Sequence, residues 1–272
     1  MLRKYSTHRT HDDNLKLGAL TAFSAGMVNV ISVIVFFAFT SNITGHYAVF
    51  AQEIAKGNWF QAAIVILWIM LFFFGSFTSN FVIIHGNNYI GRYLSHAIPI
   101  ILEIICLLVV GIYLQGFYTE SLQETEFLVG LLLFAMGLQN GLTASISNSA
   151  VKTTHLTGLT TDLAIALSMM TKKHYRKDEK VVEKIQLLSS IMFFYVLGGV
   201  ITGVLYNTIQ NYTFYIVCFF LTIIIFYDYY KLTILKYNHK KFFSLRQEEV
   251  KESKNNVQEE QNNRITEKNT CY

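Results

Sequence analysis

The chemistry open to this sequence depends on polar side chains that stand inside otherwise apolar stretches. Asn29 lies in an uncharged run near the N-terminus, and Gln139 and Asn140 lie in a second apolar run. An amide offers both donors and an acceptor, so it can bind an unwound backbone segment or a small solute. The alternative is that these amides join neighbouring helices, a contact worth about 1 kcal/mol in a membrane. The sequence supports both interpretations.

Two threonine–glycine pairs, Thr44-Gly45 and Thr157-Gly158, stand at the start of runs that could form helices. Threonine and its polar neighbours favour a helix start, and glycine allows another backbone or a ligand to approach closely. A helix that starts there would direct free N–H groups and the positive end of its dipole at whatever precedes it. Two facing starts would form a cleft suited to an anion or a carboxylate. The alternative is two ordinary caps in polar loops.

Two acidic residues stand in or beside apolar segments. Glu103 follows Pro99 by one turn, and depending on register it is interfacial or buried. A buried carboxyl there could carry a proton, which makes Glu103 a candidate for proton coupling. Asp162 falls in the first turn of a helix, where its charge either contributes to a solute site or interacts with the helix dipole.

Motifs for catalysis are absent from the sequence. It has no nucleophile elbow, zinc-protease motif, phosphate-binding loop or dinucleotide-binding motif. The cysteines Cys106, Cys218 and Cys271 lack the spacing of metal ligands. The aromatic residues lie in apolar segments rather than among basic ones, which argues against nucleic-acid binding. We therefore expect no enzyme, no metal, no cofactor and no nucleic-acid partner.

The composition indicates what positions these polar groups. Charged residues make up 15% of the 272 residues, against about 25% in an ordinary soluble domain. A transmembrane helix needs about 20 mostly apolar residues. Six segments meet or nearly meet this requirement: residues 17–39, 59–84, 98–114, 127–146, 185–206 and 214–230. The sequence predicts an all-α polytopic membrane protein with six transmembrane helices.

The placement of Lys and Arg predicts the orientation. Basic residues gather before residue 17, between 152 and 184, and after 230, whereas the loops at 116–126 and 207–212 have none. With six crossings the basic segments share one side, so both termini are expected in the cytoplasm and the protein in the cell membrane.

The expected domains follow from the same limits. They are a cytoplasmic segment at 1–16, the transmembrane domain at 17–230 and a tail at 231–272. The tail begins as a basic helix on the membrane surface or, alternatively, as a solvated helix end. From Glu252 its composition predicts disorder.

The transmembrane domain also contains an internal repeat. The residues that recur at identical spacing are Phe23, Gly26 and Asn29 in the first half and Phe134, Gly137 and Asn140 in the second. A Thr-Gly pair follows each set. Further matches are Gly75 and Ser79 with Gly199 and Gly203, small residues at a spacing that lets helices approach closely.

The repeats, at about 17–116 and 127–230, hold three spans each, which is an odd number. The fold class is therefore two inverted three-helix repeats, a design that places a transporter site between the halves near the membrane midplane.

The segments TSNITG, AMGLQN and TTHLTGLTTDLA carry a resemblance to a known family. Over roughly residues 15–230 the chain resembles the YoaK-like family of uncharacterised bacterial membrane proteins, which contain domain of unknown function 1275. The resemblance implies a six-helix bacterial membrane protein and implies no reaction.

Together these observations favour a secondary transporter or permease for a small polar or anionic solute. The alternative is a non-transporting membrane scaffold or partner subunit. The expected partners are the lipid bilayer and a small solute, and a homo-oligomer stays open. The expected substrate-binding residues are Asn29, Thr44, Gly45, Gln139, Asn140, Thr157, Gly158 and Asp162.

Overall fold

The computed structural model describes residues 10–226 and 229–230, and all regular secondary structure in these residues is helical. The chain divides into two units, residues 1–225 and 226–272, and the first unit is described here. The expected tail at 231–272 and residues 1–9 of the N-terminal segment lie outside the described residues.

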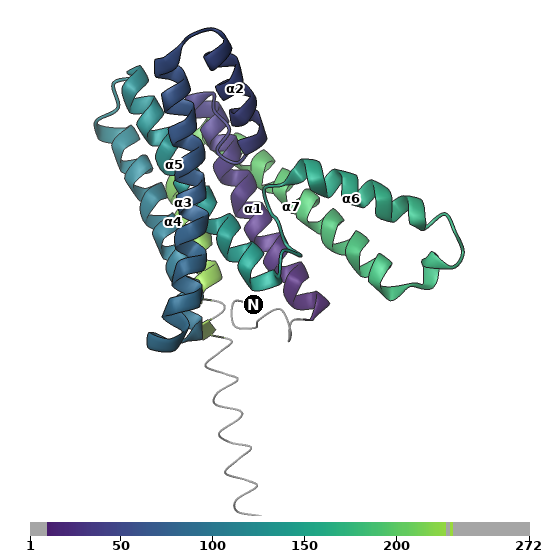
Figure 1. Cartoon of the computed structure of the whole chain (residues 1–272). Coiled ribbons are helices and arrows are strands. Elements are labelled where there is room, and N and C mark those ends of the chain that lie inside the picture. Colours follow the sequence, from purple (N-terminus) through teal and green to yellow (C-terminus); the bar gives the residue numbers. More distant parts are fainter. Residues whose placement is uncertain (1–9, 227–228, 231–272) are drawn as a thin grey trace, which may run out of the picture. The chain divides into compact units, whose positions relative to one another are not determined.

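The elements follow one another as shown in Figure 1. They are α1 (His11–Phe36), α2 (Ile43–Ala55), α3 (Trp59–Tyr89), α4 (Arg92–Gly116), α5 (Leu122–Ser147), α6 (Leu156–Met169), η2 (Tyr175–Lys177), α7 (Glu179–Ile209) and η3 (Gln210–Tyr212), followed by a helical segment at 213–226.

The long helices α1, α4, α5 and α7 begin several residues before the apolar runs seen in the sequence, whereas α3 begins at Trp59 as expected. α1 starts at His11 because the Thr10 hydroxyl accepts from the Asp13 N–H while the Asp13 carboxylate accepts from the Thr10 N–H. α5 starts after Ser121, whose hydroxyl accepts from the Glu124 N–H, and α7 starts after Asp178, whose carboxylate accepts from the Lys180 N–H. Capping residues in the polar flanks, and not the apolar runs, set these ends.

Within the described residues, five helices are long and apolar enough to cross a membrane: His11–Phe36, Trp59–Gly86, Tyr93–Gly116, Leu122–Ser147 and Glu179–Phe226. On α3 the rings of Phe73, Phe77 and Phe81 stack along an exposed face, with centroids 6.4 Å and 5.9 Å apart. Water disfavours such a surface, whereas lipid tails suit it. The chain is an integral, multi-pass membrane protein whose exposed apolar helices contact the bilayer.

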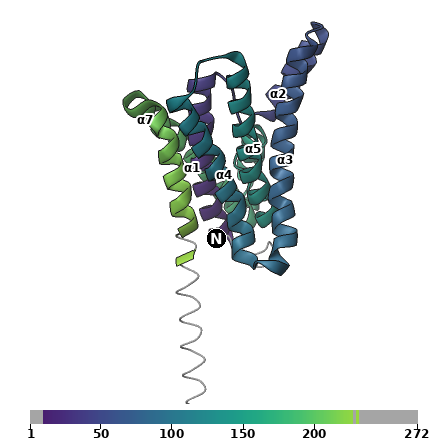
Figure 2. The ribbon, with the colours of Figure 1, turned by 90° about the vertical axis from the view of Figure 1, so that its left-hand side faces the viewer.

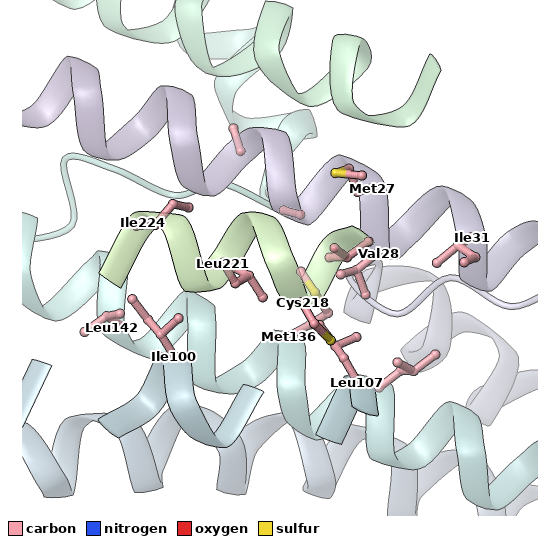
Figure 3. Close-up of a cluster of buried hydrophobic side chains, with 14 of the residues drawn as sticks. Met27, Val28, Ile31, Ile100, Leu107, Met136, Leu142, Cys218, Leu221 and Ile224 are labelled. Carbon is pink, nitrogen blue, oxygen red and sulfur yellow. The ribbon is translucent and has the colours of Figure 1, made fainter. Parts of the chain in front are cut away.

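The fifth of these helical stretches changes direction at η3. Gln210 there has φ 47° and ψ −128°, outside the helical region. After the turn, Tyr215 bonds to Gln115 near the end of α4, whereas the backbone of Ile225 accepts from Tyr93 near its start. Segment 213–226 therefore runs antiparallel to α4, and its inner side chains complete the core. Figure 3 shows Cys218 and Leu221 of this segment among side chains of α1, α4 and α5.

Two close helix crossings hold the unit together, one between α1 and α7 and one between α3 and α5 (Figure 1, Figure 2). A Cβ on Gly26 would lie 2.0 Å from the Tyr195 carbonyl oxygen, and one on Gly198 would lie 2.1 Å from that of Phe23. These helices touch backbone to backbone, so no side chain fits at either glycine.

The second crossing repeats the first. A Cβ on Gly137 would lie 2.2 Å from the Phe72 carbonyl oxygen, and one on Gly75 would lie 2.2 Å from that of Phe134. By these contacts the counterpart of Gly75 is Gly198, one residue before the Gly199 expected from the sequence.

The short helices α2 and α6 begin at the level of the middles of α3 and α7, whose Phe72, Ser76 and Tyr195 line one cavity together with the first residues of the short helices. After α1 the chain turns at Phe37, with φ 54°, and returns until Thr40 and Ser41 lie beside Asn29. After α5 it turns at Asn148 and Ser149, with φ 52° and 61°, and returns until Thr154 reaches Asn140. α2 then packs on α3, and α6 packs on α7.

Candidate functional site

A cavity of about 790 Å³ lies between the C-terminal parts of α1 and α5, the middles of α3 and α7, and the starts of α2 and α6. We call it the central cavity. It brings together four of the expected site residues: Asn29, Thr44, Asn140 and Thr157. Its other lining residues are Val30, Phe39, Ser41, Asn42, Ile43, Phe72, Ser76, Gly141, Ala144, Lys152, Thr154, His155, Leu156 and Tyr195. The volume and the mixed lining suit a small-molecule site.

Asn29 ties the segment before α2 to the last third of α1. Its side-chain oxygen accepts from the Thr40 N–H at 3.0 Å and from the Ser41 hydroxyl at 3.1 Å. The hydroxyl of Tyr195 on α7 also interacts with Asn29 and Ser41. Unwound backbone inside a membrane needs partners within the protein, and Asn29 provides one.

Asn140 does the same for the segment before α6, with fewer contacts. Its amide nitrogen donates to the Thr154 hydroxyl. The neighbouring Thr153 is fully buried and its hydroxyl has no hydrogen-bond partner, whereas that of Thr40 lies 3.4 Å from Asn29. Each segment is therefore held by an asparagine of the preceding long helix, and the second segment makes fewer hydrogen bonds to it.

The starts of α2 and α6 differ in their caps. Asn42 accepts from the Gly45 N–H at 3.1 Å, but His155, which precedes α6, makes no side-chain cap. A Cβ on Gly45 would lie 2.8 Å from the Asn42 amide nitrogen, and one on Gly158 would lie 3.1 Å from the His155 ring. Each glycine leaves room for the residue that precedes its own helix, and neither lines the central cavity.

Two further cavities adjoin the central one. The α2-side cavity, of about 450 Å³, shares Phe39 and Asn42 with it and also contains Gly45. The α6-side cavity, of about 480 Å³, shares Lys152. The shared residues place the three cavities in a row, with the central cavity between the other two.

The two flanking cavities differ in charge. The charged side chains of the α6-side cavity are Lys152, Asp162, Lys180, Glu183 and Lys184. Asp162 pairs there with Lys184 at 3.2 Å. In the α2-side cavity the one acidic side chain is Glu126, which accepts from Gln61 at 3.2 Å, and the lining there includes no Lys or Arg.

His46 of α2 also lines the α2-side cavity. It is buried, its Nε2 lies 2.8 Å from the Phe39 carbonyl oxygen, and its ring meets the edge of Trp68 at 5.5 Å. Burial lowers the pKa of His46 and outweighs the opposing effect of that hydrogen bond. The ring is therefore neutral at pH 7.

Two expected residues lie in the core instead of at a cavity. Gln139 donates from its amide to the Thr21 carbonyl oxygen at 2.9 Å and to the Ser24 hydroxyl at 2.5 Å, so it joins α5 to α1. Glu103 is fully buried in α4, and neither of its oxygens has a hydrogen-bond partner. Neither residue lines any of the three cavities in the row.

Sequence reasoning did not assign several lining residues to the site, among them Phe39, Phe72, Tyr195 and Lys152. Phe72 and Tyr195 looked like ordinary apolar-helix residues, and nothing local sets them apart. Lys152 was treated only as one of many loop cations. Alignment of the two repeats through their Thr-Gly pairs, Thr44-Gly45 and Thr157-Gly158, places it opposite Phe39.

Among the residues that the structure describes, no group of three or more His, Cys, Asp or Glu could hold a metal ion. The family described as "Protein of unknown function (DUF1275)" matches residues 17–227, most of the chain. The match confirms the resemblance at the level of this family, and the narrower YoaK-like name is not part of it. No curated protein and no solved structure matches the chain.

Proposed function

We propose that this chain, which belongs to the DUF1275 family, is a secondary transporter or permease for a small polar or anionic solute. One observation carries the proposal: the starts of α2 and α6, far apart in sequence, line the same cavity together with the polar side chains of Asn29 and Asn140. Helix starts near mid-helix depth, held by side chains from the long helices, are typical of transporter binding sites. A scaffold needs no such cavity.

The proposal includes six crossings arranged as two inverted repeats in the cell membrane, with both termini in the cytoplasm. The reversal at η3 supports treating α7 and segment 213–226 as separate crossings. The matched contacts of α1 with α7 and of α3 with α5 support a pseudo-two-fold relation between the halves. The solute would then reach the central cavity alternately through the α2-side and α6-side cavities.

We further propose that Glu103 couples transport to protons. A carboxylate ion without partners in an apolar interior is costly, so this group is held neutral and must find water or a partner before it releases its proton. Glu103→Gln keeps the shape, so solute binding should persist while proton-driven uptake into vesicles stops. Uptake that still follows an imposed pH gradient contradicts this role.

The test of the proposed site uses Thr44→Val and Thr157→Val, which keep volume and remove a hydroxyl. Binding of a panel of small anions and metabolites to the purified protein identifies a solute. Each variant should then weaken its binding by about 1–3 kcal/mol, because a buried hydroxyl contact is lost.

Thr160→Val is the matched control, since Thr160 lies on α6 with Thr157 but outside the lining of the central cavity. A capping role instead predicts about 1 kcal/mol of lost stability with binding intact. Binding that survives in both variants contradicts the site and favours the scaffold alternative.

The topology has its own test. Reporter fusions placed after Glu124 and after Asp178 should report opposite sides of the membrane. If both report the cytoplasm, the six crossings and the inverted repeat are both wrong.

A further inference from the structure

Phe39 and Lys152 occupy equivalent positions in the two segments that lead into α2 and α6. Phe39 stands two residues before Ser41, which donates to Asn29, and Lys152 stands two residues before Thr154, which accepts from Asn140. Around them the polar residues of the two segments correspond: Thr40 with Thr153, Asn42 with His155, and Thr44 with Thr157. The pair of Phe39 and Lys152 breaks this correspondence, with an aromatic ring on one side and a cation on the other.

Each of these two residues stands between the central cavity and one flanking cavity. Phe39 lines the central and α2-side cavities, and Lys152 lines the central and α6-side cavities. A solute that moves along the row therefore passes one of them on each side.

Lys152 determines the charge of the central cavity. Among the described residues that line this cavity, Lys152 is the one Lys or Arg, and none is Asp or Glu. Within the described part of the chain the ammonium has no ion-pair partner, whereas Lys184 is paired with Asp162. Lys152 is exposed, and an unpaired cation at a cavity of mixed lining favours an anion. A single ammonium matches one negative charge better than two.

The other lining residues indicate the size and polarity of the uncharged part of that anion. A volume of about 790 Å³ far exceeds what an inorganic ion fills, and Val30, Ile43, Phe39 and Phe72 provide apolar and aromatic surface. Sites of this kind bind organic molecules through apolar walls and a few placed polar groups. The asparagines and threonines can hydrogen-bond carboxylate oxygens.

We propose that Lys152 is the residue that selects for charge, and that the solute is a small organic monocarboxylate with an apolar or aromatic body. This inference rests on the proposed transport function and narrows its substrate class.

The experiment compares benzoate with benzamide and hexanoate with hexanamide, pairs that differ in charge but little in size. Binding to the purified full-length protein is measured by calorimetry or ligand-induced thermal shift. Wild type should bind at least one carboxylate about tenfold more tightly than its amide, the factor expected of a charge-assisted contact. Lys152→Gln should remove that preference and leave amide binding unchanged, and Lys152→Arg should retain it.

Lys173→Gln is the matched control. It removes the same charge from the loop between α6 and α7, outside the lining of the central cavity, and should leave the ratio as in wild type. Three outcomes overturn the inference: the ratio is unchanged in Lys152→Gln, wild type binds acid and amide equally, or wild type binds neither acid. In all three, Thr44→Val and Thr157→Val assayed with any other bound solute still test the proposed function separately.

Discussion

The segment before α2 and the segment before α6 share a backbone plan but differ in chemistry. In both, the chain leaves a long helix through residues of positive φ, turns back, and is held by an asparagine one turn after a tightly packed glycine. The first segment has a capped helix start and an aromatic residue at the central cavity, and the helix that follows it, α2, contains a buried histidine. The second has an uncapped start and a lysine there.

This comparison separates the features that form the central cavity from those that determine which solute it binds. Features common to both halves, the glycine crossings and the asparagine contacts, hold the long helices and the returning segments in place and so form the cavity. Features found in one segment, above all Lys152, are side-chain properties exposed to a solute. Substitutions in the common features should therefore act on folding in both halves, and substitutions in the differing features should act on one side only.

The largest effect is expected at the glycine crossings. Gly198→Leu and Gly75→Leu each place a side chain where a carbonyl oxygen of the partner helix would lie within about 2 Å. Each should cost about 3 kcal/mol or more, because rigid helices cannot both move aside. Unfolding of the purified variants in detergent measures this. Gly203→Leu on α7 is the control, since a Cβ there meets nothing within 4 Å. A loss at only one crossing would show that the two crossings are not equivalent.

The next largest losses of stability are expected on substitution of Asn29 and Asn140, and the two losses should differ. Asn29→Ala leaves the buried Thr40 N–H without its acceptor, at a cost of about 1–3 kcal/mol, whereas Asn140→Ala loses one contact worth about 1 kcal/mol. Asn80→Ala removes an exposed hydrogen bond to Ser145 and should change stability little. Chemical denaturation of the three variants ranks them. Equal losses for Asn29 and Asn140 would contradict the difference between the segments.

His46 should make the first segment sensitive to acid. Its pKa is lowered on folding from 6.5, so below about pH 6.5 the unfolded chain takes up the proton first and stability falls as pH falls through the folded pKa. One such group contributes at most about 1.4 kcal/mol per pH unit.

The stabilities of wild type and of His46→Gln, measured between pH 7.5 and 5, should therefore diverge below about pH 6.5. His85, which is exposed, provides the control in His85→Gln. Parallel curves for wild type and His46→Gln would show that His46 is not held neutral.

The smallest effect is expected at the ion pair of Lys184 and Asp162. Both side chains are about half exposed, so Lys184→Gln should cost no more than about 1 kcal/mol of stability, and added salt should reduce the difference. Thermal unfolding at low and high salt checks this. A larger, salt-independent loss would mean that the pair holds α6 to α7 rather than lying at an open cavity.

The sequence predicted the helical membrane class and the paired asparagines, because both follow from local composition and identical spacing. It did not predict which helices pair. The contacts of α1 with α7 and of α3 with α5 join residues far apart in the chain, and small residues show only that some close partner exists. The same limit explains why the sequence matched Gly75 with Gly199, whereas the contacts match it with Gly198. Two small residues four apart can be aligned with more than one pair of neighbouring residues.

Individual roles within the expected site were harder to predict than its location. Gln139 adjoins Asn140 in sequence but points to the core, because successive residues of a helix face directions about 100° apart. Gly45 and Gly158 look like points of solute approach, yet each makes room for Asn42 or His155. Such local contacts depend on the path of the unwound segments, which the sequence does not specify.

The central claim is that the starts of α2 and α6 face one water-accessible cavity, and a cross-linking measurement tests it most directly. The background is the full-length protein with Cys106→Ala, Cys218→Ala and Cys271→Ser, to which Thr44→Cys and Thr157→Cys are added. Both introduced thiols should react with a water-soluble methanethiosulfonate, and a short bifunctional reagent should join them within one chain. The same reagent should not join Thr44→Cys to Lys173→Cys. Thiols that each react singly but are never joined would contradict the account.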